Sequence, residues 1–279
     1  MNSKELLTGV FSRGATAYRE RLEEAMRKGE AAGRDAILDY LKPRPGMRIL
    51  DLACGPGTLT IPMARDLNGA GEVIGIDLAE GMLAVGRQAA GGRSLPVRFL
   101  RMDIENLQFP AATFDAVSCG HGLHFLPNLG RALREVRRVM KPNARFAASI
   151  PPSAGPDPSP AVDAFRKAID KRLGPAPAQP ELAATRAILG ALDRFAGAAL
   201  AAGFRFAEAE RVEVETSWDG PAHYAGVNAS WWAFAVRMEG LSEHVRRMVV
   251  DEAAEAVRKV TGEAPFQTPA TANVLRAEA

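Results

Sequence analysis

The sequence predicts an α/β fold in which helices cover a mainly parallel sheet. Between residues 47 and 150, apolar runs of strand length alternate with helical patterns, which is typical of strand–helix units. Three of these runs end in an acidic residue, at Asp51, Asp77 and Asp103, about 26 residues apart. Because parallel strands present their carboxyl ends at one edge of a sheet, we expect the three carboxylates to be aligned there.

A glycine turn follows the first of these strands. The run from Met47 to Ala53 reads as a short buried strand, Gly55-Pro56-Gly57 as a turn, and the residues from Leu59 onward as a helix. Glycine lets backbone come close to a ligand, and free N–H groups at a helix start favour a polar or negative ligand group. This indicates a nucleotide-type binding loop, although an ordinary strand-to-helix turn stays open. The G-x-G-x-x-G match is partial, because Thr60 takes the third glycine position.

The same stretch resembles the first motif of class I S-adenosylmethionine-dependent methyltransferases, which has an acid, a small residue and a Gly-x-Gly turn. Asp77 with the following Met82-Leu83 resembles the family's second motif, and Asp103-Ile104 follows a third strand over 97–102. The resemblance is strong over residues 47–150 and points to the group that methylates quinones and natural products. It implies a seven-stranded, Rossmann-like methyltransferase sheet with an antiparallel last strand and helical cap insertions.

Asp77 lies at the end of the strand over 71–78, 20 residues beyond Gly57. A carboxylate at this spacing suits a clamp on ribose hydroxyls. The resemblance implies that Asp103 accepts from the adenine amine and that Met82 touches the cofactor. The residues expected to bind S-adenosylmethionine are Tyr18, Asp51, Ala53, Gly55, Gly57, Asp77, Leu78, Met82, Asp103, Ile104 and Cys119.

The fourth strand, over 114–119, is followed by two histidines. The stretch from Gly120 to Pro127 resembles a family motif that often ends in Leu-His-His, but Phe125 replaces the second histidine. His121, between two glycines, and His124 are the candidate catalytic residues. An imidazole with a pKa near 6.5 could take a proton from an acidic hydroxyl or enol. The alternatives are that His124 is only a packed, hydrogen-bonded residue and that His121 is only a wall of the pocket.

Residues 1–46 are expected to form an N-terminal helical lid over the core of residues 47–150. A helix is predicted from Ala15 to Tyr40 with a break near Gly29 and Gly33. Phe11 and Tyr18 loosely resemble the Phe and Tyr that the family has in a lid over the cofactor. Residues 151–279 are expected to complete the sheet, with strands near 204–215 and 271–276, the latter beside the fifth strand of 145–150. Helical patterns over 161–202 and 221–262 are predicted to form an acceptor-binding cap, with aromatic residues that either line a pocket or fill the cap's own core: Trp218, Tyr224, Trp231, Trp232 and Phe234.

Composition excludes several classes of partner. The net charge is only +2, and the basic helix over 128–140 lacks interleaved aromatic residues, so no nucleic-acid partner is expected. No apolar run approaches the roughly 18 residues that a bilayer requires, which predicts no integral membrane segment and a cytoplasmic protein. Cys54 and Cys119 lack metal or redox spacing, so neither a metal site nor a disulfide is expected.

The sequence thus predicts transfer of a methyl group from S-adenosylmethionine to a small, largely apolar organic acceptor, by O- or C-methylation. Two other enzyme classes stay open. One is a cyclase on the same scaffold that retains the cofactor. The other is a nicotinamide-dependent oxidoreductase, which Thr60 and the Asp103-Ile104 pair argue against. A homodimer also stays open.

Overall fold

The computed structural model describes residues 3–31, 33–91, 95–151 and 159–279, apart from the side chain of Trp232. The chain forms two compact units. Unit 1 comprises Met1–Ser153, Pro180–Glu213 and Thr271–Ala279, and unit 2 comprises Ala154–Gln179 and Val214–Ala270.

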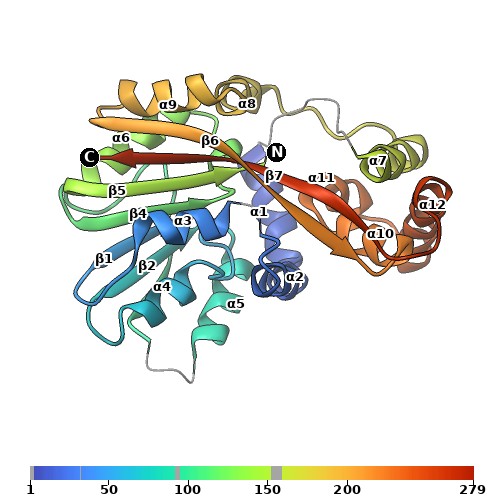
Figure 1. The fold of residues 1–279 in the computed structure, drawn as a ribbon, viewed down its shortest axis with the longest axis horizontal. Helices are drawn as coiled ribbons and strands as arrows, with labels where there is room; N and C mark the ends of the chain where they lie inside the picture. The colour runs from blue at the N-terminus through green and yellow to red at the C-terminus, as the bar shows by residue number, and fades with distance from the viewer. Residues whose placement is uncertain (1–2, 32, 92–94, 152–158) are drawn as a thin grey trace. The chain divides into compact units, whose positions relative to one another are not determined.

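A seven-stranded sheet in the order β3-β2-β1-β4-β5-β7-β6 organises unit 1 (Figure 1). Strands β1 to β5 pair in parallel, and β7 pairs antiparallel to β5, with Ala148 opposite Leu275. The expected sheet with its antiparallel last strand is therefore confirmed. The strands are β1 (Arg48–Leu52), β2 (Glu72–Asp77), β3 (Val97–Arg101), β4 (Phe114–Gly120), β5 (Met140–Ile150), β6 (Phe206–Trp218) and β7 (Phe266–Glu278).

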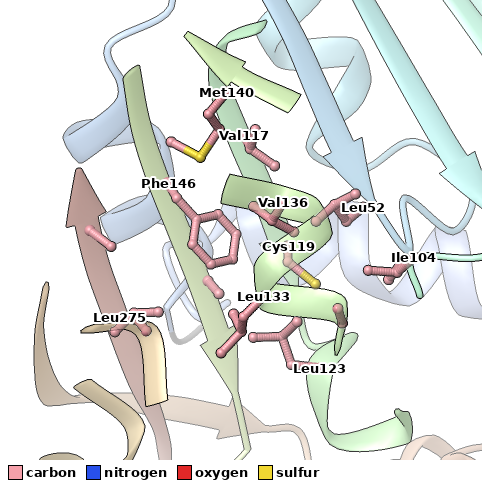
Figure 2. Packing of buried hydrophobic residues seen from close by; sticks show 14 of the residues in the cluster. Leu52, Ile104, Val117, Cys119, Leu123, Leu133, Val136, Met140, Phe146 and Leu275 are labelled. Carbon is pink, nitrogen blue, oxygen red and sulfur yellow. The ribbon is translucent and has the colours of Figure 1, made fainter. Parts of the chain in front are cut away.

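Alternating apolar residues in the central strands bury both faces of the sheet. Leu50 and Leu52 of β1 join one core cluster, whereas Ile49 joins another, because successive side chains of a strand point to opposite faces. Helices α6 (Leu129–Val139) and α9 (Leu192–Ala201) pack on the first face, and α3 (Arg34–Leu41) and α4 (Thr60–Asp66) on the second. Figure 2 shows Val117 and Phe146 of the strands beside Val136 of α6.

The last three strands are longer than expected. Strand β5 begins at Met140 rather than Arg145, so that Lys141-Pro142-Asn143, whose composition is typical of a turn, lies inside it. Asn143 still has φ of 62°, the left-handed conformation that asparagine tolerates, and the β4–β5 register shifts between Phe114 and Ala116. Strands β6 and β7 have 13 residues each, and each has residues in both units.

The N-terminal region has three helices, where one interrupted helix from Ala15 was expected. Helix α1 (Ser3–Arg13) precedes α2 (Ala15–Arg27), and α3 begins at Arg34. Gly33 has φ of 81°, and a Cβ atom there would lie 2.8 Å from the Cβ of Ser149. The predicted break at this glycine is therefore required both by its conformation and by close packing on β5.

Helices α8 (Ala183–Gly190) and α9 belong to unit 1, although we expected them in the cap. The reason is that Leu189, Phe195 and Ala199 pack into the core cluster on the sheet. Helix α5 (Glu80–Ala90) follows β2, and the short helices are η1 (Leu123–Phe125), η2 (Pro180–Leu182) and η3 (Val236–Met238).

Unit 2 has an aromatic core of its own. Its helices are α7 (Pro160–Leu173), α10 (Pro221–Ala229), α11 (Trp232–Ala235) and α12 (Glu243–Thr261). Tyr224 is buried in this core and packs edge-on against Trp218, with ring centroids 4.9 Å apart, while Phe234 packs against Phe165. Trp218, Tyr224 and Phe234 therefore fill the core of unit 2, and the side chain of Trp232 lies outside the described part of the chain. None of the described helices combines the length and apolar character that crossing a membrane requires.

Candidate functional site

A cavity opens in unit 1 where the first four strands end. Its walls come from the segments after β1 to β4, from α1, α2 and α5, and from η1. The lining residues that the sequence predicted are Tyr18, Ala53, Gly55, Asp77, Leu78, Met82, Asp103, Ile104 and His121. The predicted residues Asp51, Gly57, Cys119 and His124 are absent from this lining.

The loop after β1 is held in an unusual backbone conformation. Ala53, Gly55 and Gly57 have φ of 47°, 55° and 81°, and Cys54 N donates a hydrogen bond to the carbonyl of Ile76 at 2.9 Å. A Cβ atom on Gly55 would meet only the sulfur of Met82 at 3.9 Å, so the cavity side of this residue is open. A Cβ atom on Gly57 would lie 2.8 Å from Cζ of Phe99. Gly57 thus lets the loop pack on β3, which differs from its expected role of approaching a ligand.

Asp77 connects the end of β2 to this loop. Its Oδ2 accepts from Gly55 N at 2.9 Å, and its Oδ1 accepts from Ala79 N at 2.8 Å. Burial raises the pKa of this carboxyl, and the hydrogen bonds from the backbone at Ala79 and Gly55 oppose that rise. Each oxygen has a second lone pair, so the carboxylate can still accept from a ligand hydroxyl.

Asp51 lies behind the loop and supports it. The residue is 1% exposed, and its carboxylate accepts from the hydroxyls of Thr60 at 2.5 Å and Ser118 at 2.7 Å. Burial raises its pKa to about 6 despite these hydrogen bonds. Asp51 lines a smaller cavity together with Arg34 and Thr58 rather than the main one. Asp51 therefore lines a different cavity from Asp77 and Asp103, although the charge of Asp77 still acts on it.

Asp103 forms an ion pair with a residue that sequence reasoning missed. Lys4 Nζ of α1 lies 2.7 Å from Asp103 Oδ2 and 3.0 Å from Glu105 Oε2. Burial lowers the pKa of Lys4, but the hydrogen bonds to the two carboxylates outweigh it, so that the pKa is raised. Helix α1 is thereby connected to the segment after β3. No motif marked Lys4, because its partners lie about a hundred residues further along the chain.

His121 lies directly after β4 and lines the main cavity. Its φ is 59°, and its backbone N–H donates a hydrogen bond to the backbone carbonyl of Ser149 at 2.8 Å. Burial and the nearby guanidinium of Arg34 hold the pKa of its imidazole well below 6.5. The expected pKa near 6.5 is therefore wrong, because both influences disfavour the imidazolium. The neighbouring Gly122 serves close packing, since a Cβ atom there would lie 2.5 Å from that of Ala53.

His124 and Cys119 occupy buried positions away from the cavity lining. The ring of His124 lies 3.8 Å from that of Phe125 between centroids, and burial together with Arg186 lowers the pKa of His124 to about 3. Cys119 joins the core on the α6 face of the sheet (Figure 2), where burial raises the pKa of its thiol to about 12. These positions give both residues a packing role.

Part of the cavity wall is apolar. Phe11 of α1 packs edge-on against Phe125 of η1, with ring centroids 5.5 Å apart, and against Tyr18 of α2 at 6.0 Å. Leu7 and Leu126 complete this wall. The expected lid aromatics Phe11 and Tyr18 thus line the cavity, and Phe125 contributes an apolar ring where the family motif often has histidine. In the described residues no group of histidine, cysteine and acidic side chains could hold a metal.

Comparison with known proteins places this chain among methyltransferases. A family profile described as "Methyltransferase domain" matches residues 49–143. The nocamycin O-methyltransferase of Saccharothrix syringae is 31% identical over 244 residues, which cover 82% of each chain. The 2-phytyl-1,4-naphtoquinone methyltransferase of Synechococcus elongatus is 36% identical over 148 residues, which cover 51% of this chain and 62% of that protein. Matches to this and other quinone methyltransferases span 42% to 62% of their lengths.

Solved structures share the fold. A phosphoethanolamine N-methyltransferase 2 from Haemonchus contortus, in complex with S-adenosylhomocysteine, has a TM-score of 0.54 at 16% identity over 88% of this chain and 52% of that one. The [4+2]-cyclase SpnF has a TM-score of 0.52 at 20% identity over 88% and 79%. These likenesses extend to the fold alone, whereas the sequence relationship extends across most of the chain. The chain therefore belongs to the class I S-adenosylmethionine-dependent methyltransferases.

Proposed function

We propose that the protein transfers a methyl group from S-adenosylmethionine to a small, largely apolar organic acceptor, at oxygen or carbon. The observation that carries this proposal is the composition of one cavity. Carboxylates and open backbone at the strand ends form one part of its wall, and Leu7, Phe11, Phe125 and Leu126 form an apolar part. A polar nucleoside and an apolar acceptor could therefore meet in the same enclosure.

The residues present fit the cofactor. Asp77 would accept from the ribose hydroxyls through its remaining lone pairs, and the open side of Gly55 would let the loop backbone approach the ligand. Asp103 and Ile104 would meet the adenine ring. The guanidinium of Arg34, buried beside the loop, would supply positive charge for the cofactor's carboxylate. Tyr18, Leu78 and Met82 would provide apolar contact.

When bound, S-adenosylmethionine supplies an electrophilic methyl carbon on a sulfonium sulfur. The chain's own part is to hold the acceptor atom in line with that carbon and to exclude water. Positioning of this kind accounts for much of the rate of bimolecular transfers. The apolar wall of α1 and η1 suits this task, since Phe11 and Phe125 pack against one another in it.

The alternatives have less support. A cyclase shares the fold, but the relatives that match by sequence are named as methyltransferases, so the cyclase alternative is not favoured. The dinucleotide-binding motif of nicotinamide enzymes has glycine at the position of Thr60. In this chain the Thr60 hydroxyl instead donates a hydrogen bond to Asp51.

The test combines binding and transfer. Calorimetric titration of the full chain with S-adenosylmethionine should give a single saturable site, while reduced nicotinamide cofactor should not bind. Incubation with methyl-deuterated S-adenosylmethionine and a panel of phenols, hydroquinones and enols should yield labelled products in the mass spectrum. Binding without label in any acceptor, together with an isomerised product, would favour the cyclase.

A further inference from the structure

Arg34 and His121 contact one another beside the main cavity. Nη1 of Arg34 lies 3.5 Å from Nδ1 of His121, and Arg34 is 3% exposed. A guanidinium carries donors only. In this contact Nδ1 must therefore be the acceptor, so that a neutral imidazole carries its proton on Nε2. The unprotonated nitrogen of this tautomer is Nδ1, which already faces the guanidinium of Arg34.

Nε2 of His121 is buried and has no hydrogen-bond partner among the described residues. A buried N–H without an acceptor is unfavourable, and a ligand oxygen that reached it would remove this cost. The imidazole lines the cavity, next to the apolar wall that includes Phe125 and Leu126. The residue that carries the unpaired donor therefore shares this cavity with Phe125 and Leu126.

The surroundings keep this imidazole neutral. Burial lowers its pKa, and so do the two groups that act on it, Arg34 of α3 and His124 of η1. Neither of these groups is a carboxylate. The other lining groups that titrate are Tyr18, Lys4, Asp77 and Asp103, of which Lys4 is paired with Asp103 and Asp77 binds the loop backbone. Lys4, Asp103 and Asp77 are thus engaged in other contacts.

We infer that His121 donates a hydrogen bond through Nε2 to an oxygen of the methyl acceptor, with Arg34 holding the imidazole in this tautomer, and that the acceptor is a phenol or enol acidic enough to bind as its anion. This rests on the proposed function and names its substrate class. The anion's lone pair, on oxygen or on the conjugated carbon, forms the new bond to the methyl carbon. The carbon–sulfur bond breaks, and its electron pair stays on sulfur. At oxygen the neutral ether forms directly. At carbon the neutral keto form results, and its tautomerisation moves the proton from that carbon to the oxygen without net release.

The tautomer can be measured without any turnover. Long-range proton–nitrogen correlation spectra of the full chain labelled with 15N-histidine report which ring nitrogen is protonated, and His121→Gln identifies the His121 signals by their loss. We expect an unprotonated Nδ1 and a protonated Nε2 from pH 8 down to pH 6. A proton on Nδ1, or an imidazolium at pH 7, would overturn the inference while leaving the proposed methyl transfer untouched.

The acceptor class has its own test, with 4-nitrophenol as probe in the presence of S-adenosylhomocysteine. A donor at Nε2 favours the phenolate, so the protein should lower the apparent pKa of 4-nitrophenol, as followed by its absorbance. His121→Gln retains an N–H donor without a basic nitrogen and should keep phenolate affinity within about threefold, whereas His121→Leu should lose about tenfold or more, as for hydrogen bonds to charged groups. A raised pKa, no shift at saturating protein, or equal losses in both variants would contradict the donor role.

Discussion

The carboxylate of Asp77 accepts a hydrogen bond from the backbone N–H of Gly55 at 2.9 Å, so that the end of β2 is connected to the glycine loop after β1. The carboxylate also binds Ala79 N at the start of α5. One side chain thus fixes three segments that line the cavity. Its proposed role toward ribose and its role in shaping the loop are therefore combined in the same two oxygens.

Asp77→Ala should lower the affinity for S-adenosylmethionine by at least about tenfold, because charge-assisted hydrogen bonds to the ribose are lost. Isothermal titration calorimetry measures the change. Asp103→Ala should weaken binding less, since the adenine amine is a neutral donor, and Asp66→Asn, at an exposed position of α4, serves as the control. Wild-type affinity in Asp77→Ala would exclude the ribose role.

Gly57→Ala should destabilise the fold more than Gly69→Ala. Both glycines have φ of 81°, but a Cβ atom on Gly57 would lie 2.8 Å from Cζ of Phe99, whereas one on Gly69 would meet nothing within 4 Å. The left-handed conformation alone costs an L residue about 1–2 kcal/mol, and the contact with Phe99 adds about 1–3 kcal/mol for overpacking. Urea unfolding of the two variants measures the difference. Equal losses would show that Phe99 moves aside freely.

Gly55→Ala should instead act on binding. Its φ of 55° and the open space around it predict a loss of about 1–2 kcal/mol in stability, as for any left-handed alanine. The added methyl group would stand where the cofactor approaches the backbone, so the affinity for S-adenosylmethionine should fall by more than in Gly57→Ala. The reverse order of affinities would place the ligand elsewhere along the loop.

Asp51 should make the fold less stable as the pH rises from 4 to 7. Its folded pKa of about 6 exceeds the ordinary value of 3.8, so the folded state binds the proton more tightly than the unfolded state does. Stability from this group is therefore present at low pH and lost as the pH rises through 6. The difference of 6 − 3.8 = 2.2 pKa units corresponds to about 3 kcal/mol.

Asp51→Asn should remove this contribution. Other carboxylates, such as Glu135 with its lowered pKa, act in the opposite direction, so the informative quantity is the wild-type minus variant difference in unfolding free energy at each pH. That difference should fall between pH 4 and pH 7. A constant difference would mean that Asp51 titrates at its ordinary pKa.

Trp218→Ala should destabilise the protein more than Trp231→Ala. Trp218 packs on the buried Tyr224 and donates to Thr268 Oγ1 at 2.9 Å, whereas Trp231 is half-buried and lies between α10 and α11. Truncating a core aromatic such as Trp218 should cost about 3–5 kcal/mol of stability. Thermal unfolding of the two variants measures the difference. Similar stability losses in both variants would make Trp231 a core residue as well.

Much of the fold could be predicted because its signals are local. Strand-length apolar runs, the glycine turn and the acids at strand ends each depend on neighbouring residues, and the sheet order follows once the family resemblance is recognised. Strand β5 was predicted short because Lys141-Pro142-Asn143 has turn composition. In the structure this segment is part of β5 as an irregularity between the paired residues Met140 and Arg145, with φ of 62° at Asn143. Helices α8 and α9 were assigned to the cap because periodicity shows an apolar face without showing what covers it.

The sequence by itself determined that acidic residues lie at or near the ends of β1, β2 and β3 and that a glycine loop follows the first. Only the tertiary structure decided which of these acids can meet a ligand. Asp51 is enclosed by Thr60 and Ser118, whereas Asp77 and Asp103 face the cavity. Tertiary structure likewise decided the environment of His121, because the guanidinium that lowers its pKa belongs to Arg34, 87 residues away in the chain. Residue type and spacing specify the local conformation, but charge, burial and hydrogen-bond partners arise only when distant segments pack together.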